Sequence, residues 1–159
     1  MNIMINIENV DFSYSKKNFL IEGFSLQMES EKIYCLIGEN GAGKSTLLKL
    51  ISGVESPKKG NILIDGLDYE DNYFAIKELL LAFINEPSFY PHLSAYDNLR
   101  VLCKYRNLPE EGINEALEFV ELHNQKGKFG KFSSGMKQRL ILAIIYLMDA
   151  KLLLLDEPF

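Results

Sequence analysis

The chain reads Gly38-Glu39-Asn40-Gly41-Ala42-Gly43-Lys44-Ser45 in its first third, with Thr46 next. This octapeptide fits the pattern G-x-x-x-x-G-K-S/T at every fixed position. The apolar run Ile33–Ile37 before it predicts a strand that is buried on both faces, and the leucines after it have helical spacing. Between a strand and a helix, glycines let successive backbone N–H groups point at phosphate oxygens. The octapeptide therefore predicts a phosphate-binding loop.

Two side chains of this loop have a defined chemical role if a nucleoside triphosphate binds there. Lys44 would place its charge at the β- and γ-phosphates, and the Ser45 hydroxyl would be a ligand of Mg²⁺. The alternative is a glycine-rich turn between a strand and a helix that carries Lys and Ser by chance. The number of matched positions and the flanking elements favour phosphate binding.

A pair of acids follows the last apolar run of the chain. Leu152–Leu155 predicts a buried strand, and Asp156 and Glu157 come directly after it. Such a strand would hold Asp156 where it can bind Mg²⁺ through water, and Glu157 could take a proton from an attacking water. General-base help of this kind is worth about 10²–10⁴-fold in rate. Two acids after a strand are usually just solvated, but together with a phosphate loop they predict a hydrolytic site.

The remaining pattern alternates strands with helices. Strands are expected over Asn2–Val10, Phe19–Met28, Asn61–Ile64 and Leu79–Ile84. A capping box, Ser94-Ala95-Tyr96-Asp97, predicts one helix start; Pro109 opens a second helix, and Ser133-Ser134 opens a third that runs to about Met148. The pattern indicates an α/β fold around a parallel core, with a helical block from about Ser94 to Gly130 set into it.

These motifs, in this order, resemble the ATP-binding subunit of ABC transporters over essentially the whole chain. The resemblance implies a P-loop NTPase of the ABC ATPase type, with a mixed sheet core, an N-terminal antiparallel β-subdomain and an inserted helical subdomain. Residues 1–159 would form one nucleotide-binding domain, with the helical subdomain at about 86–135. Tyr14 matches the aromatic residue that stacks on adenine in this family, and the alternative is a strand tyrosine packed on the core.

A second segment of the chain is similar to the LSGGQ signature of the family. In Phe132-Ser133-Ser134-Gly135-Met136, Ser133 and Gly135 match, whereas Ser134 replaces a glycine and Met136 replaces the glutamine. The resemblance implies that this segment caps the γ-phosphate of ATP held by the opposite subunit. The alternative is a serine N-cap on an amphipathic helix. The run from Gly135 to Arg139 resembles the bacitracin- and lantibiotic-type exporter ATPases in particular.

The segment after Leu81 resembles the same subgroup. Asn85 occupies the position of the family's Q-loop glutamine, which implies a contact with Mg²⁺ and the attacking water. The asparagine side chain is one methylene shorter, so Glu86 is the alternative for this role. Phe89-Tyr90-Pro91 lies where the family contacts its membrane subunit, and plain packing between the two lobes is the alternative.

Composition and charge exclude several other classes of protein. The chain has 159 residues and a net charge of −5, which argues against a nucleic-acid-binding surface. Its longest apolar run, Leu140–Met148, is too short to span a membrane, and the N-terminus does not read as a secretory signal. Cys35 and Cys103 are expected to be buried in a reducing compartment. His92 and His123 are expected at the surface, and neither follows the acid pair as the family's switch histidine does.

We therefore expect a subunit that binds and hydrolyses Mg-ATP at the cytoplasmic face of the membrane. It would drive export through a separate membrane-spanning subunit and pair with a second nucleotide-binding subunit. The alternatives are an ATP-binding module without turnover and a soluble ABC ATPase outside transport. A GTPase is disfavoured because the chain lacks the guanine-reading motif, and a small-molecule kinase is disfavoured by the signature and the acid pair.

The position of the last residue leads to one more expectation, about the length of the subunit. The chain ends at Phe159, two residues after Glu157, where the family continues with the D-loop, the switch histidine and further helices. The resemblance implies that these residues are the N-terminal part of a longer subunit. On their own they are expected to be poorly stable and weak or inactive as an ATPase.

Overall fold

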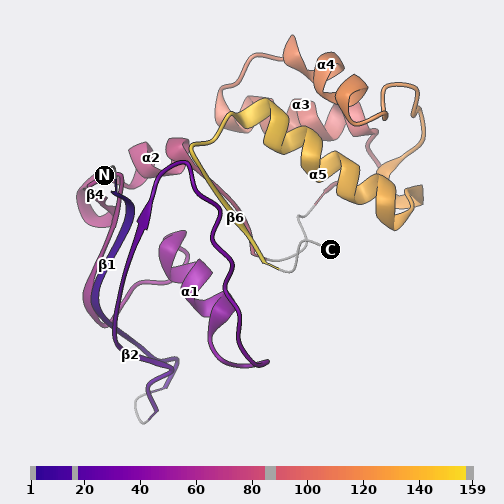
Figure 1. Ribbon diagram of the computed structural model, residues 1–159. Coiled ribbons are helices and arrows are strands. Elements are labelled where there is room, and N and C mark those ends of the chain that lie inside the picture. Colours follow the sequence, from indigo (N-terminus) through magenta and orange to yellow (C-terminus); the bar gives the residue numbers. More distant parts are fainter. Residues whose placement is uncertain (1–2, 16–17, 85–88, 157–159) are drawn as a thin grey trace. The chain divides into compact units, whose positions relative to one another are not determined.

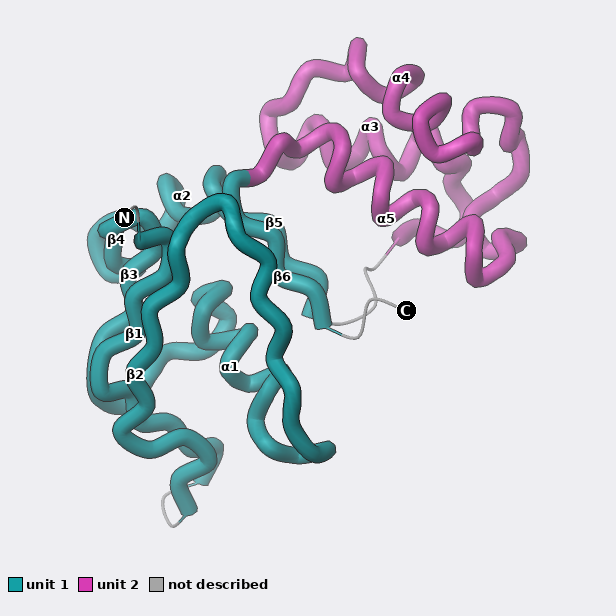
Figure 2. The backbone as a smooth tube through the Cα atoms, viewed as in Figure 1, with its two compact units in different colours: residues 1–85, 151–159 teal, residues 86–150 magenta. Residues whose placement is uncertain are grey.

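The computed structural model describes residues 3–15, 18–84 and 89–156 (Figure 1). The chain forms two compact units: unit 1 comprises residues 1–85 and 151–159, and unit 2 comprises residues 86–150 (Figure 2). The phosphate-loop sequence and the acid pair belong to unit 1, and the signature-like segment belongs to unit 2. Asn85, Glu86 and Glu157 lie outside the described residues.

Unit 1 contains an antiparallel sheet of four strands in the order β2-β1-β3-β4. Strand β1 (Ile3–Phe12) pairs on one side with β2 (Ile21–Glu29) and on the other with β3 (Lys59–Ile64), which pairs with the short β4 (Leu67–Asp68). Side chains alternate across a strand, so Ile5 and Ile7 share one face of β1, and both are fully buried. This sheet is the expected N-terminal antiparallel subdomain.

A bulge interrupts the pairing of β1 with β3. The register shifts between Glu8 and Asp11, and Asn9 has a φ of 48°. Opposite the shift, Gly60 has a φ of +79°, and a Cβ built on it would lie 2.3 Å from the carbonyl oxygens of both Glu8 and Asn9. Glycine is required here because the neighbouring backbone occupies the space of a side chain.

In its described residues, unit 1 also contains two helices and a parallel strand pair. Helix α1 (Lys44–Ile51) follows the phosphate loop, and helix α2 (Tyr69–Leu79) leads into β5 (Leu80–Phe83). Strand β5 pairs in parallel with β6 (Leu152–Leu155), as the apolar runs at both places predict. One core joins these elements to the antiparallel sheet through buried Leu50, Ile76 and Leu154, among other residues. The sequence patterns did not predict α2.

The segment Ile33–Ile37 corrects the expectation of a buried strand before the phosphate loop. It has no regular secondary structure, and Ile33 and Ile37 are 101% and 92% exposed. None of the strands in the described ranges pairs with it, so its backbone has no ladder of hydrogen bonds to join. Cys35 is exposed for the same reason, and the expectation that it is buried was wrong.

Unit 2 is helical and contains α3 (Ala95–Arg106), α4 (Gly112–Phe119), the 3-10 turn η1 (Phe129–Lys131) and α5 (Ser134–Met148). The predicted capping box forms: the Ser94 hydroxyl accepts from the Asp97 N–H at 3.1 Å and donates to the Asp97 carboxylate at 2.7 Å. Helix α5 packs against α4, so this compact unit extends to Ala150, beyond the limit of about 135 expected for the helical subdomain. As expected, Cys103 is buried, whereas His92 and His123 are exposed.

Asn98 fixes the segment before α3 to the helix. It is 5% exposed, and its Oδ1 accepts from the Tyr90 N–H at 2.8 Å. Its Nδ2 donates to the carbonyl oxygens of Tyr90 and Ser94, at 3.2 and 2.9 Å. The buried amide is therefore fully used by local backbone groups.

None of the helices in the described part of the chain is both long enough and apolar enough to cross a bilayer.

Candidate functional site

The glycine-rich loop leads directly into helix α1, as its sequence predicts. Gly41 and Gly43 have φ values of +83° and +92°, and the Ala42 N–H donates to the Glu39 carbonyl at 3.2 Å. Gly43 is the N-cap of α1, and its carbonyl accepts from the Leu47 N–H at 2.8 Å. The first N–H groups of a helix have no acceptor within the helix, and the helix dipole adds positive potential there. The loop therefore presents donors to an anion.

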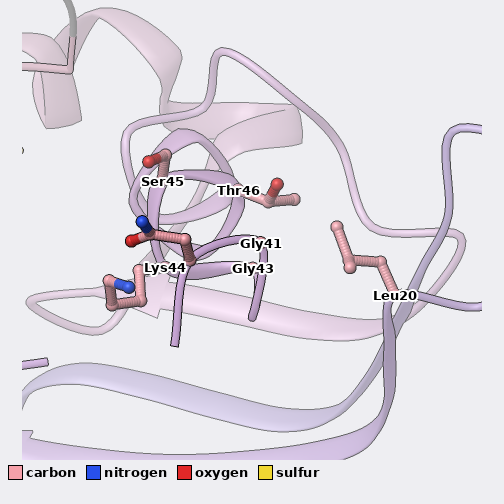
Figure 3. Close-up of a pocket in the computed structure, with 7 residues that line it drawn as sticks. Leu20, Gly41, Gly43, Lys44, Ser45 and Thr46 are labelled. Carbon is pink, nitrogen blue, oxygen red and sulfur yellow. The ribbon is translucent and has the colours of Figure 1, made fainter. Parts of the chain in front are cut away.

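A pocket of about 380 Å³ lies at this loop (Figure 3). Most of its lining comes from the predicted octapeptide and the residue after it, and one apolar residue comes from elsewhere: Leu20, Asn40, Gly41, Gly43, Lys44, Ser45 and Thr46. The Ser45 side chain is exposed, whereas Thr46 is 7% exposed. The loop therefore lines a concave site, and Ser45 is exposed there.

Leu20 is a site residue that the sequence patterns did not identify. It is 39% exposed, and a Cβ on Gly43 would lie 3.5 Å from its Cγ, so Leu20 lies against the loop. The Leu20 N–H donates to the Phe12 carbonyl at 2.8 Å, which holds it next to the end of β1. Nothing in the local sequence could have identified Leu20, because only the fold brings it to the loop.

The Lys44 side chain bends back to contact its own loop. Its Nζ donates to the carbonyl oxygens of Gly38 and Glu39, at 2.8 and 2.9 Å. An ammonium group has three donors, so these two bonds leave one free for an incoming ligand. The cation thus lies at the loop that would surround a phosphate group.

Tyr14 lies near this loop and outside the core. The side chain is 62% exposed, which does not fit the alternative of a tyrosine packed in the core. Its hydroxyl lies 3.4 Å from the Thr46 Oγ1, and its ring meets the Phe12 ring edge-on, with centroids 4.9 Å apart. The ring is therefore close to the phosphate loop and accessible to a planar ligand.

Asp156 follows β6 at the carboxyl end of the parallel strand pair. Its backbone N–H donates to the Phe83 carbonyl at 2.9 Å, which continues the ladder between β5 and β6 by one bond. The Ser45 hydroxyl and the Asp156 carboxylate are oxygen donors of the kind that Mg²⁺ prefers. Among the described residues, no group of three or more His, Cys, Asp or Glu side chains could hold a metal ion.

The signature-like segment forms the start of α5 in unit 2. Ser133 is the N-cap, with its Oγ accepting from the Met136 N–H at 3.3 Å. Ser134, Gly135 and Met136 form the first turn, and Ser134 and Gly135 are exposed. Ser133 is thus a capping serine, and the first-turn N–H groups of α5 have no partner within the helix.

Comparison with known proteins identifies the class to which this fold and loop belong. The family profile described as "ABC transporter" matches residues 21–159. The chain belongs to the ABC transporter family. A solved structure of the ATP-binding subunit of an ABC transporter has a TM-score of 0.85 and 27% identity, and the match covers 98% of this chain and 67% of that one. The fold is therefore that of an ABC ATPase domain.

Two of the relatives are ATP-binding proteins of particular transporters. Bacitracin transport ATP-binding protein BcrA of Enterococcus faecalis is 36% identical over 160 residues, which is 99% of this chain and 52% of that protein. Lantibiotic transport ATP-binding protein SrtF of Streptococcus pyogenes is 38% identical over 156 residues, which is 98% of this chain and 66% of that protein. The chain thus spans between half and two thirds of the length of these relatives.

Proposed function

We propose that this chain binds Mg-ATP as the ATP-binding subunit of an ABC transporter, and that ATP hydrolysis drives export through a separate membrane-spanning subunit. The observation that carries this proposal is the phosphate loop, with Lys44 folded over its carbonyls beside an open pocket. A role in transport is supported by the names of the two relatives, a bacitracin transport and a lantibiotic transport ATP-binding protein. The chain would then lie on the cytoplasmic face of the membrane, bound to the permease.

Nucleotide binding would use groups that lie around the loop. The backbone N–H groups from Gly38 to Thr46 would surround the β- and γ-phosphates, and Lys44 would donate its remaining N–H to a phosphate oxygen. Tyr14 would stack on the adenine ring, a contact worth about 1–3 kcal/mol for a base on an aromatic side chain. Ser45 and Asp156, together with Asn85, would hold Mg²⁺, which neutralises charge on the phosphates when bound.

Hydrolysis would use the acid after Asp156. A water oxygen attacks the γ-phosphorus, and the bond from that phosphorus to the β–γ bridging oxygen breaks. Glu157 accepts the proton of the water, so the products are ADP and inorganic phosphate. Asn85, or Glu86 in its place, would orient the water. In a dimer of nucleotide-binding subunits, the segment from Ser133 to Met136 would cap the γ-phosphate held by the partner.

Titration calorimetry with Mg-ATP tests the binding step. Lys44→Ala should weaken binding by about 10- to 100-fold, as expected when charge-assisted hydrogen bonds to phosphate are lost. Lys49→Ala is the matched control, because it removes the same charge from the last turn of the same helix. An unchanged affinity of Lys44→Ala for Mg-ATP would contradict the assignment of the loop.

Phosphate release separates an ATPase from a module that only binds ATP. The assay is made with the permease and the second nucleotide-binding subunit present, and Glu157→Gln should lower the rate by about 10²–10⁴-fold. Equal rates for Glu157→Gln and the unchanged protein, with Mg-ATP still bound, would favour the binding-only alternative. Turnover that is independent of a permease would favour a soluble ABC ATPase.

A further inference from the structure

The segment that carries Tyr14 is held by a lysine from a distant part of the chain. Lys58 Nζ donates to the Ser13 Oγ at 2.6 Å and to the Ser15 carbonyl at 3.2 Å. The Ser13 hydroxyl in turn donates to the same Ser15 carbonyl at 2.6 Å. The residues on both sides of Tyr14 are therefore joined to one ammonium group. Hydrogen bonds from a charged donor are about twice as strong as those between neutral groups.

Tyr14 depends on these bonds because its own contacts are few. Strand β1 ends at Phe12, so residues 13–15 lie beyond the sheet. The Tyr14 ring is 62% exposed, touches Phe12 edge-on, and reaches Thr46 only through a long hydroxyl contact of 3.4 Å. Ser13, by contrast, is 4% exposed. The direction of the ring is therefore set by the backbone on each side of it.

The backbone of β1 and the approach to β3 bring Lys58 to this place. The Lys58 N–H donates to the Asp11 carbonyl at 2.8 Å, immediately after the bulge opposite Gly60. The neighbouring Lys59 points to a different partner, and its Nζ lies 3.5 Å from the Asp11 carboxylate. Two adjacent lysines thus contact different groups, and Lys58 is the one bonded to the Tyr14 segment.

We propose that Lys58 is a positioning residue for nucleotide recognition, which holds Tyr14 beside the phosphate loop so that the ring can stack on a base. This inference rests on the proposed function, because it takes Tyr14 as the base-stacking residue. It implies that different residues of the site recognise the base and the phosphates. Lys58 acts on the base through Tyr14, and the loop acts on the phosphates.

The test compares two ligands that share the phosphates and differ in the base. Affinities for Mg-ATP and for Mg-tripolyphosphate are measured by titration calorimetry. Lys58→Met should weaken Mg-ATP binding by about three- to tenfold, a partial loss of a stacking contact. Its affinity for tripolyphosphate should stay within about twofold. Lys58→Arg should retain most of the ATP affinity, because a guanidinium also donates to a hydroxyl and a carbonyl.

Three further variants make the result specific. Lys59→Met removes the same charge one residue away and should leave both affinities unchanged. Ser13→Ala removes only the hydroxyl and should give the same selective loss of ATP affinity as Lys58→Met, which covers the case in which Lys58→Met does not fold. Tyr14→Ala sets the full size of the base contribution.

Each outcome has a distinct meaning. Unchanged ATP affinity in Lys58→Met and Ser13→Ala overturns the positioning role while leaving the proposed function intact. An equal loss for ATP and tripolyphosphate also overturns it, because Lys58 would then act on the phosphates or on the fold. If the unchanged protein binds neither ligand, the proposed function fails first, and the positioning role fails with it.

Discussion

Two glycines with the same backbone angle have different surroundings. Gly60 and Gly66 both have a φ of +79°, which costs an L-residue about 1–2 kcal/mol. A Cβ on Gly60 would also lie 2.3 Å from two backbone oxygens of β1, whereas a Cβ on Gly66 meets nothing within 4 Å. Comparing the two positions therefore separates the free-energy cost of a positive φ from the free-energy cost of the steric contact with β1.

The prediction at the scale of a residue is that replacing each of these glycines by alanine lowers the stability by a different amount. Gly60→Ala should lower the free energy of unfolding by about 2–5 kcal/mol, the sum of the angle and an overpacking term. Gly66→Ala should lower it by only about 1–2 kcal/mol. Urea titration followed by circular dichroism measures both. Equal losses would mean that the bulge at Asn9 can move to accommodate a methyl group.

At the scale of an element, side chains of helix α2 donate hydrogen bonds to carbonyl groups at the C-terminal end of helix α1. The Tyr69 hydroxyl donates to the Ile51 carbonyl at 2.7 Å, and Lys77 Nζ donates to the Ser52 carbonyl at 2.7 Å. Both acceptors belong to the end of α1, where carbonyl groups have no partner within the helix. A phenol and a cation from α2 thus satisfy the terminus of the helix that begins at the phosphate loop.

The contribution of Tyr69 to the stability of the protein depends on pH. Burial raises the pKa of Tyr69, and the nearby Tyr73 raises it further. The unfolded chain therefore loses the tyrosine proton first, so the stability that Tyr69 contributes is present below about pH 10 and declines as the pH rises above it. Tyr69→Phe should cost about 0.5–1.5 kcal/mol near neutral pH. In urea titrations at pH 8 and pH 10.5, the difference in stability between the unchanged protein and Tyr69→Phe should narrow at the higher pH. A constant difference would contradict the raised pKa.

Elements with local signals were predictable from the sequence. The capping serines Ser94 and Ser133 each begin the helix that the sequence predicts, because a cap acts within one turn of its own residue. The loop from Gly38 to Ser45 was predictable for the same reason, since its glycines determine the backbone directly. Strands β5 and β6 followed from continuous apolar runs.

The remaining features depend on partners that are distant in the sequence. The run Ile33–Ile37 has the composition of a buried strand, but burial requires a neighbouring strand, and none of the described strands pairs with it. Helix α2 has a single fully buried residue, Ile76, so its apolar periodicity is weak. Leu20 and Lys58 reach the site only through the pairing of β1, and no local pattern encodes that approach.

At the scale of the whole molecule, unit 1 carries an apolar surface at residues 33–37. Ile33 and Ile37 are almost fully exposed, and Tyr34 is 45% exposed. The chain has a net charge of −5, so long-range repulsion between copies is modest and is screened by salt. An exposed apolar segment without a partner strand is prone to association.

The chain is therefore expected to self-associate as its concentration rises, most strongly at high salt. Replacing both Ile33 and Ile37 by Ser should reduce the association measured by sedimentation velocity, with little change in the free energy of unfolding, because neither side chain is packed. Val54→Ser is the control, since Val54 is 64% exposed and lies elsewhere in unit 1. Association that is unaffected by the double substitution would place the contact on another surface.

The two cysteines differ in a way that has a practical consequence. Cys103 is completely buried, and burial raises the pKa of its thiol, whereas Cys35 is exposed three residues before Gly38. A thiol must be accessible and ionised to react, so a maleimide dye should attach at Cys35 and leave Cys103 unmodified. The natural sequence thus offers a single labelling position next to the phosphate loop, from which fluorescence could follow the arrival of a nucleotide without any engineered residue.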